Sequence, residues 1–317
     1  MKILSIIIPV YNAQDYIVDT VNSVLYNMPS NVEIIIINDG STDNSVSLIK
    51  KEFSEYIELE TILFIDQDNA GVSCARNVGI NKSRGEYITF VDADDLLADN
   101  YYDVIFPVLT QYTPDIIEFG CTKFVKTEDI NSNPTIFTQN NFGLLKTEAV
   151  IGDVFAQSIF YTPLRIINKQ ILKDLKFPVG VAFCEDMIFL YQLYQQSDII
   201  YHIDKSLYAY RDNIDGATRN IKPDYLQAML TLYQKLIKDK RPEVSYLKVN
   251  VFYVIYSCSS KLGKKISLPL SIFVDSKKLA LKFSFDKKIS LRKKMILLIP
   301  NIHQKLAALK SYYKSRG

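Results

Sequence analysis

Short apolar runs alternate with longer amphipathic stretches over the first hundred residues of the chain. The apolar runs, rich in Ile and Val, cover residues 4–10, 32–37, 61–65 and 88–91. Such runs are typical of strands that are buried on both faces of a parallel sheet. The stretches between them predict helices at about residues 11–28, 44–53 and 72–82. This alternation predicts an α/β fold with an open, mostly parallel twisted sheet flanked by helices.

The pattern becomes less regular after residue 95. It predicts helices at residues 100–110, 144–155 and 184–196. It predicts short or antiparallel strands at residues 115–124, 134–137, 199–202 and 207–211. From Pro223 to residue 317 the pattern is helical, so a second region is expected to begin there.

Polar side chains follow the carboxyl ends of the expected strands, where open parallel sheets bind ligands. Asp39, Asn69 and the run from Asp92 to Asp95 all lie at such ends. On an extended backbone Asp92 and Asp94 would face one way and Asp95 the other. Paired carboxylates favour Mg²⁺ or Mn²⁺, although Asp94 or Asp95 could equally cap a following helix.

The distribution of charge separates the C-terminal region from the rest. Residues 231–317 hold 20 Lys and Arg against 4 Asp and Glu, a net charge of +16, whereas residues 1–230 hold 17 against 31, a net charge of −14. Lysines interleaved with apolar residues suit a helix that lies on an anionic membrane surface. A helical bundle packed against the rest of the chain is the alternative. Nucleic-acid binding is not expected, because no recognition motif accompanies the charge.

Cysteine, histidine and hydropathy patterns exclude several classes. The four cysteines show no metal-ligand spacing. The sequence has only two histidines, and so small a number disfavours zinc binding or histidine-based catalysis. No run of about 18 apolar residues occurs, and the N-terminal apolar run is too short for a signal peptide. The chain is therefore expected in the cytoplasm, peripheral on the inner face of the cytoplasmic membrane.

Five motifs occur in a characteristic order, at residues 5–12, 37–43, 69–79, 92–95 and 185–186. With these motifs the chain resembles the family 2 glycosyltransferases of the GT-A fold, over about residues 3–220. The resemblance implies a UDP-sugar donor, a divalent cation (Mn²⁺ or Mg²⁺), and inverting transfer to a glycan or lipid-linked acceptor. It implies a role in bacterial surface polysaccharide synthesis, such as that of capsule or lipopolysaccharide.

The resemblance, the helical pattern after Pro223 and the change in charge together predict an organisation of the chain. Residues 1–222 would form the catalytic domain, with a nucleotide-binding half at 1–98 and an acceptor-binding half at 99–222. Residues 223–317 would form a basic helical region. A homo-oligomer formed through this region is an alternative to membrane docking.

Site residues follow from the resemblance, position by position. Those expected to bind the nucleotide sugar are Pro9, Tyr11, Asp39, Asn69, Arg76, Asp92 and Arg211. Asp94, with Asp92, would hold the metal, which offsets charge on the leaving diphosphate. Asp186, with Glu185 beside it, matches the base that takes the acceptor hydroxyl's proton.

Structural roles are the alternatives at each of these positions. Asp39 could belong to a turn, and Arg76 could form a weak surface pair with an acid on its own helix. An acidic pair at residues 185–186 suits a helix start. Arg165 stands where the family usually has Lys, which leaves its role open. The resemblance also makes Thr218 a candidate for a contact with the diphosphate. The alternative functions are a nucleotidyltransferase or a non-catalytic nucleotide-sugar-binding subunit.

Overall fold

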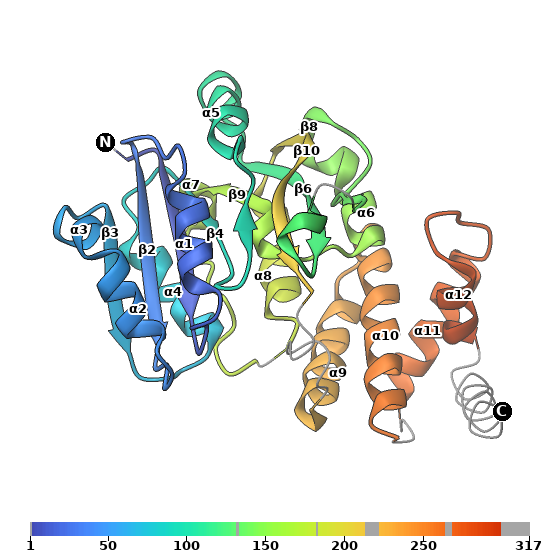
Figure 1. Cartoon of the computed structure of the whole chain (residues 1–317). Helices are drawn as coiled ribbons and strands as arrows, with labels where there is room; N and C mark the ends of the chain where they lie inside the picture. Colours follow the sequence, from blue (N-terminus) through green and yellow to red (C-terminus); the bar gives the residue numbers. More distant parts are fainter. Residues whose placement is uncertain (1, 131–132, 182, 213–221, 264–267, 299–317) are drawn as a thin grey trace. The chain divides into compact units, whose positions relative to one another are not determined.

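The structure, a computed structural model, describes residues 2–130, 133–181, 183–212, 222–263 and 268–298 (Figure 1). The chain divides into two compact units. The first comprises residues 1–150 and 160–214, and the second comprises residues 151–159 and 215–317. Thr218 lies outside the described residues.

Four parallel strands form the N-terminal half of the sheet, in the order β3-β2-β1-β4. They are β1 (Leu4–Val10), β2 (Val32–Asp39), β3 (Ile62–Gln67) and β4 (Tyr87–Phe90), and β1 to β3 lie in the blue part of the chain in Figure 1. Every residue of β1 and β2 is buried, as their β-branched runs predict. The polar ends of these strands therefore meet at one edge of the sheet.

Helices α1 (Ile17–Leu25), α2 (Ser45–Glu52), α3 (Ser54–Glu58) and α4 (Val72–Lys82) connect these strands. Helix α4 packs on β1 and β2, and it does so closely at Gly79. A Cβ atom at Gly79 would lie 2.3 Å from Cγ2 of Ile7, so only glycine allows this approach. Close packing of α4 fixes the position of the side chains that it directs toward the strand ends.

The second half of the sheet is mixed, and it adds short antiparallel pairs to the parallel pairs that the sequence predicts. The order continues from β4 through β9 (Arg165–Asn168), β6 (Ile116–Phe124) and β10 (Ile199–Arg211) to β5 (Leu96–Leu97). Strand β9 is antiparallel to both β4 and β6, whereas β6 and β10 are parallel. Two short strands, β7 (Thr135–Ile136) and β8 (Gly143–Lys146), pair with β6 and β10.

Two local predictions were wrong in this half. The two strands predicted at 199–202 and 207–211 are one strand, β10, because register shifts between His202 and Tyr208 let it continue past the polar residues 204–206. The helix predicted at 144–155 begins instead at Thr147, as α6 (Thr147–Gln157), because the residues before it pair with β10 as β8.

Helices α5 (Tyr101–Tyr112), α7 (Lys169–Leu172) and α8 (Glu185–Leu193) complete the first unit, with short 3₁₀ turns at η1 (Thr127–Asp129), η2 (Thr162–Leu164) and η3 (Tyr194–Gln196). Helix α8 begins at the acidic pair that the sequence singled out. Its N-cap residue, Cys184, has φ +60°, so the chain turns sharply just before those two carboxylates.

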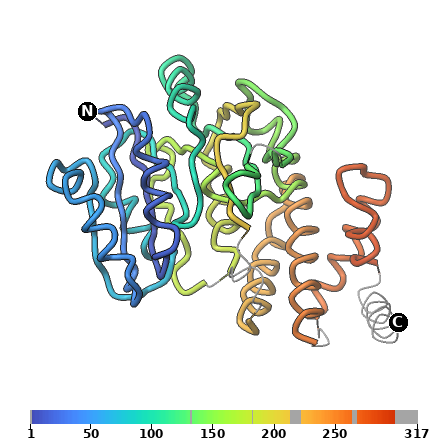
Figure 2. Tube along the Cα trace, in the orientation of Figure 1, coloured from blue at the N-terminus to red at the C-terminus, as the bar shows by residue number. Residues whose placement is uncertain are grey.

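The second unit is helical, as expected. It contains α9 (Pro223–Lys238), α10 (Val244–Lys261), α11 (Leu270–Lys282) and α12 (Leu291–Leu298), drawn in orange and red in Figure 2. Helix α10 packs against the other three. Across the described residues, none of the helices combines the length and the apolar character needed to cross a membrane.

Candidate active site

A single buried guanidinium joins three of the predicted site carboxylates. Arg76 on α4 donates from Nη1 to Asp186 (2.7 Å) and Glu185 (3.2 Å), and from Nη2 to Asp92 (3.1 Å). Its side chain is 4% exposed, and its guanidinium lies over the ring of Phe177, 5.2 Å from the centroid. We call these four charged residues the Arg76 cluster. It joins the end of β4 to the start of α8, segments more than ninety residues apart.

Asp186 is held from two sides. One carboxylate oxygen accepts from Arg76 and the other accepts from the backbone N–H of Thr162, 3.2 Å away. Both acids of α8 lie in its first turn, where the helix dipole stabilises negative charge. The Asp186 side chain is 19% exposed, so solvent or a ligand still reaches it.

Charge within the Arg76 cluster is unbalanced, because three carboxylates share one cation. Burial opposes the charge of Arg76, but attraction to Asp186, Asp92 and Glu185 outweighs it and raises the pKa of the guanidinium. Burial and then repulsion from Asp186 raise the pKa of Glu185. Burial also raises the pKa of Asp92, and attraction to Arg76 only partly offsets this. The cluster therefore favours an additional cation.

Residues 92–95 form a turn, the carboxylate turn, rather than the extended segment assumed from the sequence. Strand β4 ends at Phe90, and the N–H of Asp95 donates to the carbonyl of Asp92 (3.1 Å). The prediction assumed an extended backbone at residues 92–95, and that assumption was wrong. Asp92 and Asp94 are partly exposed, whereas Asp95 is buried.

Asp95 holds the carboxylate turn from inside the protein. Its carboxylate accepts from the hydroxyl of Tyr208 (2.7 Å) and from the backbone N–H of Arg211 (2.7 Å). The Tyr208 hydroxyl in turn accepts from the N–H of Asp92 (3.1 Å). Burial, with repulsion from Asp92 and Asp94, raises the pKa of Asp95 well above its usual value. Asp95 is thus a structural acid behind two accessible ones.

Arg211 also contacts the carboxylate turn, through its side chain. Its Nε donates to the backbone carbonyl of Asp94 (2.7 Å). Its guanidinium lies over the rings of Tyr16 and Phe124, at 4.8 and 4.5 Å from their centroids. Arg211, expected to bind the nucleotide sugar, therefore lies beside the predicted metal ligand Asp94.

Asp39, at the end of β2, closes the loop after β3. Its carboxylate accepts from the side chain of Gln67 (2.7 Å) and from the N–H groups of Ala70 and Gly71 (both 2.9 Å). Asn69 donates to the Asp39 carbonyl (2.9 Å). The bonds from Gln67, Ala70 and Gly71 use three of about four acceptor positions of the Asp39 carboxylate. One position therefore remains for a donor on a ligand.

Pro9 and Tyr11 border the same edge of the sheet. Pro9 is buried within β1, whereas the side chain of Tyr11 is 54% exposed just beyond it. Asn12, at φ +50°, donates through its N–H to Ser41 (3.0 Å) and accepts from the N–H of Thr42 (2.8 Å). The loops after β1 and β2 are therefore fastened together, with the Tyr11 ring open to solvent.

A divalent cation fits the oxygen ligands at the carboxylate turn. Among the described residues, no three or more His, Cys, Asp or Glu side chains form a group that could hold a metal unaided. Mg²⁺ and Mn²⁺, however, commonly take one or two carboxylates together with substrate phosphates. Asp92 and Asp94 offer such carboxylates, and their combined negative charge acts on Asp95.

Arg165, whose role the sequence left open, belongs to a buried network in the first unit. It pairs with Glu118 (3.5 Å), donates to the hydroxyl of Tyr194 (3.0 Å) and donates to the carbonyl of Tyr161 (2.8 Å). Arg165 and Glu118 are both fully buried. The network fixes Tyr161, and the next residue, Thr162, donates to the carboxylate of Asp186. Arg165 thus supports the loop that holds Asp186.

Sequence reasoning missed Tyr208, Thr162 and Phe177. Tyr208 gave only a weak signal, because it is one of several tyrosines in an apolar strand. Thr162 acts through its backbone, which no residue type reveals. Phe177 packs between Phe189 and Phe90 and lies under Arg76, so its contribution depends on tertiary contacts.

Comparison with known proteins assigns the chain to a family. The model of the family described as "Glycosyl transferase family 2" matches residues 5–176. The chain belongs to glycosyl transferase family 2. The match covers the ends of β1, β2, β3 and β4, and the family resemblance expected from the five motifs is confirmed.

Named relatives agree with this membership. The chain is 30% identical over 233 residues to Glycosyltransferase GlyA of Streptococcus pneumoniae, across 72% of this chain and 33% of GlyA. It is 29% identical over 224 residues to the glycosyltransferase EpsJ of Bacillus subtilis, across 69% of this chain and 63% of EpsJ. The chain thus matches about a third of one relative and less than two thirds of the other.

Solved structures share the fold over nearly the whole chain. Residues 1–349 of S. aureus TarS in complex with UDP-GlcNAc match with a TM-score of 0.68 at 17% identity, covering 99% of this chain and 92% of TarS 1–349. The mannosyltransferase PcManGT of Pyrobaculum calidifontis, in complex with GDP-Man and Mn²⁺, matches with a TM-score of 0.54 at 15% identity, covering 99% and 81%. The predicted GT-A fold with a helical C-terminal region is confirmed.

Proposed function

We propose that this glycosyltransferase moves a hexosyl or N-acetylhexosaminyl group from a UDP-sugar to a hydroxyl of a glycan or lipid-linked acceptor, with inversion. The observation that carries the proposal is the Arg76 cluster. It brings the end of β4, where a donor diphosphate and its cation would lie, to the two acids at the start of α8. Transfer requires both groups of residues: those at the end of β4 would stabilise the leaving diphosphate, and the acids of α8 would activate the acceptor hydroxyl.

Asp186 is the proposed general base. Its carboxylate is held by Arg76 and by the Thr162 N–H, and it remains partly exposed. A fixed carboxylate within hydrogen-bond reach of the acceptor hydroxyl takes its proton as the oxygen attacks the anomeric carbon, typically accelerating reaction by about 10²–10⁴-fold. Attack from the face opposite the leaving diphosphate inverts the anomeric carbon.

Asp94 and Asp92 are the proposed metal ligands. A bound Mn²⁺ or Mg²⁺ would neutralise charge on the departing diphosphate. Arg211, fixed against the backbone of Asp94, places a further positive charge beside the turn. The Mn²⁺ in the complex of PcManGT supports a cation-dependent reaction.

The loops after β1, β2 and β3 are the proposed binding site for the nucleotide. Tyr11 offers an exposed ring for stacking, and Asp39 and Asn69 offer polar groups at the edge of the sheet. The complex of TarS with UDP-GlcNAc supports a UDP-sugar as donor. Synthesis of a bacterial surface polysaccharide is the proposed role, by analogy with the family.

Incubation of the purified protein with UDP-sugars and Mn²⁺ tests the proposed reaction. Release of UDP, increased by an oligosaccharide or lipid-linked acceptor, is expected. A nucleotidyltransferase would instead form a UDP-sugar and pyrophosphate from UTP and a sugar phosphate. A non-catalytic subunit would bind the donor but release no UDP. Either of the last two outcomes would overturn the proposal.

A membrane-bound acceptor gives the helical unit a proposed role on the inner face of the cytoplasmic membrane. Helices α11 and α12 and the segment between them expose a set of large apolar side chains: Leu270, Phe273, Val274, Leu281, Phe285, Leu291, Met295 and Leu298. Phe285 is 95% exposed, and Lys277, Lys278, Lys287 and Lys288 lie in the same segment. Exposed apolar groups among lysines suit the interface of an anionic bilayer.

A further inference from the structure

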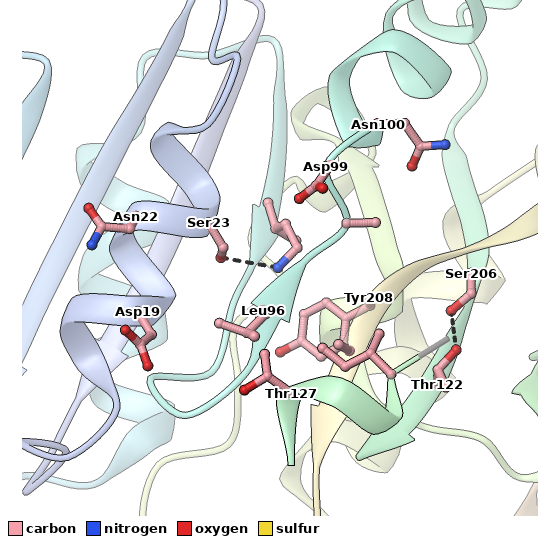
Figure 3. Close-up of a pocket in the computed structure, with 14 residues that line it drawn as sticks. Asp19, Asn22, Ser23, Leu96, Asp99, Asn100, Thr122, Thr127, Ser206 and Tyr208 are labelled. Carbon is pink, nitrogen blue, oxygen red and sulfur yellow. Dashed lines mark hydrogen bonds between the residues drawn. The ribbon is translucent and has the colours of Figure 1, made fainter. Parts of the chain in front are cut away.

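A cavity of about 760 Å³ lies within the first unit and is lined in part by β5, the strand that follows the carboxylate turn (Figure 3). Its lining combines one face of α1 with β5, the start of α5, η1 and parts of β6 and β10. The lining residues are Asp19, Asn22, Ser23, Leu96, Leu97, Ala98, Asp99, Asn100, Thr122, Thr127, Ile130, Ser206, Tyr208 and Ala209. The volume is in the usual range for a small-ligand site. No residue of the Arg76 cluster lines it.

The cavity has an apolar base and a polar rim. Leu96 and Ala209 belong to a buried apolar cluster against which Ile130 packs. Asp19 and Asn22 come from α1 on one side, and Thr122 and Ser206, hydrogen-bonded to each other at 2.7 Å, come from the other, as Figure 3 shows. An apolar surface bordered by carboxylate, amide and hydroxyl groups matches the alternating C–H and O–H surface of a sugar ring.

The charge of the lining selects among ligand classes. Of the 14 lining residues, all within the described part of the chain, none is Lys or Arg, and two are Asp. A nucleotide or another phosphate ligand would meet repulsion there without a compensating cation. Hydroxyl groups of a neutral ligand, in contrast, can donate to the carboxylates of Asp19 and Asp99 in charge-assisted hydrogen bonds. The lining thus favours a neutral polyhydroxylated ligand.

The cavity is connected to the carboxylate turn through Tyr208. The Tyr208 side chain lines the cavity, while its hydroxyl donates to Asp95 and accepts from the N–H of Asp92. On the α1 side, Thr20 donates to the carbonyl of Ala93 (2.9 Å), and Ser23 accepts from the N–H of Leu97 (3.1 Å). A ligand in the cavity would therefore contact the groups that fix the turn.

We propose that this cavity is a second, neutral-saccharide site, which binds a sugar unit of the acceptor or product glycan away from the transfer site. The assignment of the saccharide to the acceptor glycan rests on the proposed glycosyltransferase function. Occupancy of the site holds a glycan on the enzyme between transfers. It also restrains Tyr208 and α1, and through them the carboxylate turn.

Direct binding measurements test the site without relying on turnover. The probes are neutral oligosaccharides of two to four units (maltotriose, cellotriose and N,N′,N″-triacetylchitotriose), measured by saturation-transfer NMR and calorimetry with saturating UDP and Mn²⁺ present. Asn22→Trp and Thr127→Trp replace exposed residues at the cavity rim and fill it with a ring. Ser47→Trp, on the exposed face of α2 outside the cavity, is the matched control.

At least one probe is expected to bind the wild type and the Ser47→Trp variant alike. Each rim variant should weaken its binding at least tenfold while leaving UDP binding within twofold. The proposal is overturned if no probe binds, if the rim variants bind as the wild type does, or if only Mn²⁺ binds in the cavity. A wild type that binds a saccharide probe but releases no UDP from a UDP-sugar would contradict the proposed function and not this site.

Discussion

At the scale of single residues, the sequence identified the chemical groups but not their partners. Asp92, Arg76 and Asp186 were recognised from motifs, and the structure brings all three together. The alternative considered for Arg76, a weak surface pair, is wrong, because its partners lie on other elements and the guanidinium is buried. Pairing across more than ninety residues depends on how α4 and α8 pack, which no local pattern contains.

Arg76→Lys separates positioning from nucleotide binding. Lysine keeps the charge, but a single ammonium cannot bridge Asp92 and the two acids of α8 as the planar guanidinium does. We expect kcat to fall at least tenfold, with the Kd for the UDP-sugar within about threefold, because the base loses its orientation. A Kd that rises as much as kcat falls would show instead that Arg76 mainly binds the nucleotide.

Arg76→Ala provides the matching stability measurement. Removing the cation leaves three partly buried carboxylates uncompensated, and loss of one partner of a buried pair commonly costs about 3–5 kcal/mol. Part of this cost is relieved by solvent at the exposed edges of the carboxylates. Urea denaturation is therefore expected to show a loss of about 2–4 kcal/mol in the free energy of unfolding.

Asp94→Ala tests the metal site. We expect a loss of turnover of at least a hundredfold, because a metal contributes several kcal/mol to stabilising the leaving group. EDTA should silence the wild type, and Mn²⁺ should restore it. Asp103→Ala removes an exposed carboxylate on α5 and should have no effect. Full wild-type activity in EDTA would refute the assignment of Asp94.

At the scale of elements, the buried parallel strands were predictable and the bulged strand was not. The runs of Ile and Val in β1 and β2 are typical of parallel strands that are buried on both faces. Strand β10 carries Tyr208 and Arg211 into the site and His202 into the core, yet its polar residues 204–206 made it look like two strands. Its register shifts are set by pairing with β6, which the sequence of β10 alone does not show.

His202 on β10 is expected to make the stability of the fold depend on pH. The ring is buried, stacks on Phe142 with centroids 4.7 Å apart, and its Nδ1 lies 2.6 Å from the carbonyl of Asn141. Burial lowers the pKa of His202 below its usual 6.5. Its contribution to stability is therefore complete above pH 6.5 and is lost as the pH falls toward the folded-state pKa.

His202→Gln should remove that dependence. Measured by urea denaturation at pH 7.5 and 5.0, the wild type is expected to lose more stability on acidification than the variant, because its buried imidazole opposes protonation in the folded state. The other histidine, His303, is present in both proteins and lies outside the described residues. Equal losses in the two proteins would show that His202 does not couple folding to pH.

At the scale of the whole molecule, the sequence pattern predicted a helical C-terminal region and the change in charge set it apart, but neither showed the contacts within that region. Lys248 pairs with Asp275 (3.1 Å), and Tyr246 donates to Asp286 (2.6 Å). Removing residues after 261 would therefore expose the apolar face of α10, which α11 and α12 cover. Point substitutions of the exposed apolar side chains therefore test membrane docking better than a truncation does, because they leave the contacts of α10 in place.

The double variant Leu270→Ser, Phe285→Ser is expected to weaken binding to anionic vesicles at least fivefold. Both side chains are exposed, so the fold should tolerate the change. Each lysine near an anionic surface adds about 1 kcal/mol to binding, and salt screens this part, so wild-type binding should decrease at high salt. Binding should not vanish, because burial of the apolar side chains does not depend on charge. Leu59→Ser, at an exposed leucine of the first unit, is the control in co-sedimentation. A wild type that ignores anionic vesicles at low salt would refute docking.

The turnover of Asp186→Asn, measured together with donor binding, tests the central claim most directly. The substitution keeps the size of the side chain and an acceptor for the Thr162 N–H, but removes the basic function. With a UDP-sugar, Mn²⁺ and acceptor, kcat for UDP release is predicted to fall by at least a hundredfold, while the Kd for the UDP-sugar stays within about threefold. Near wild-type kcat in this variant would contradict the account and would move the search for a base to Glu185.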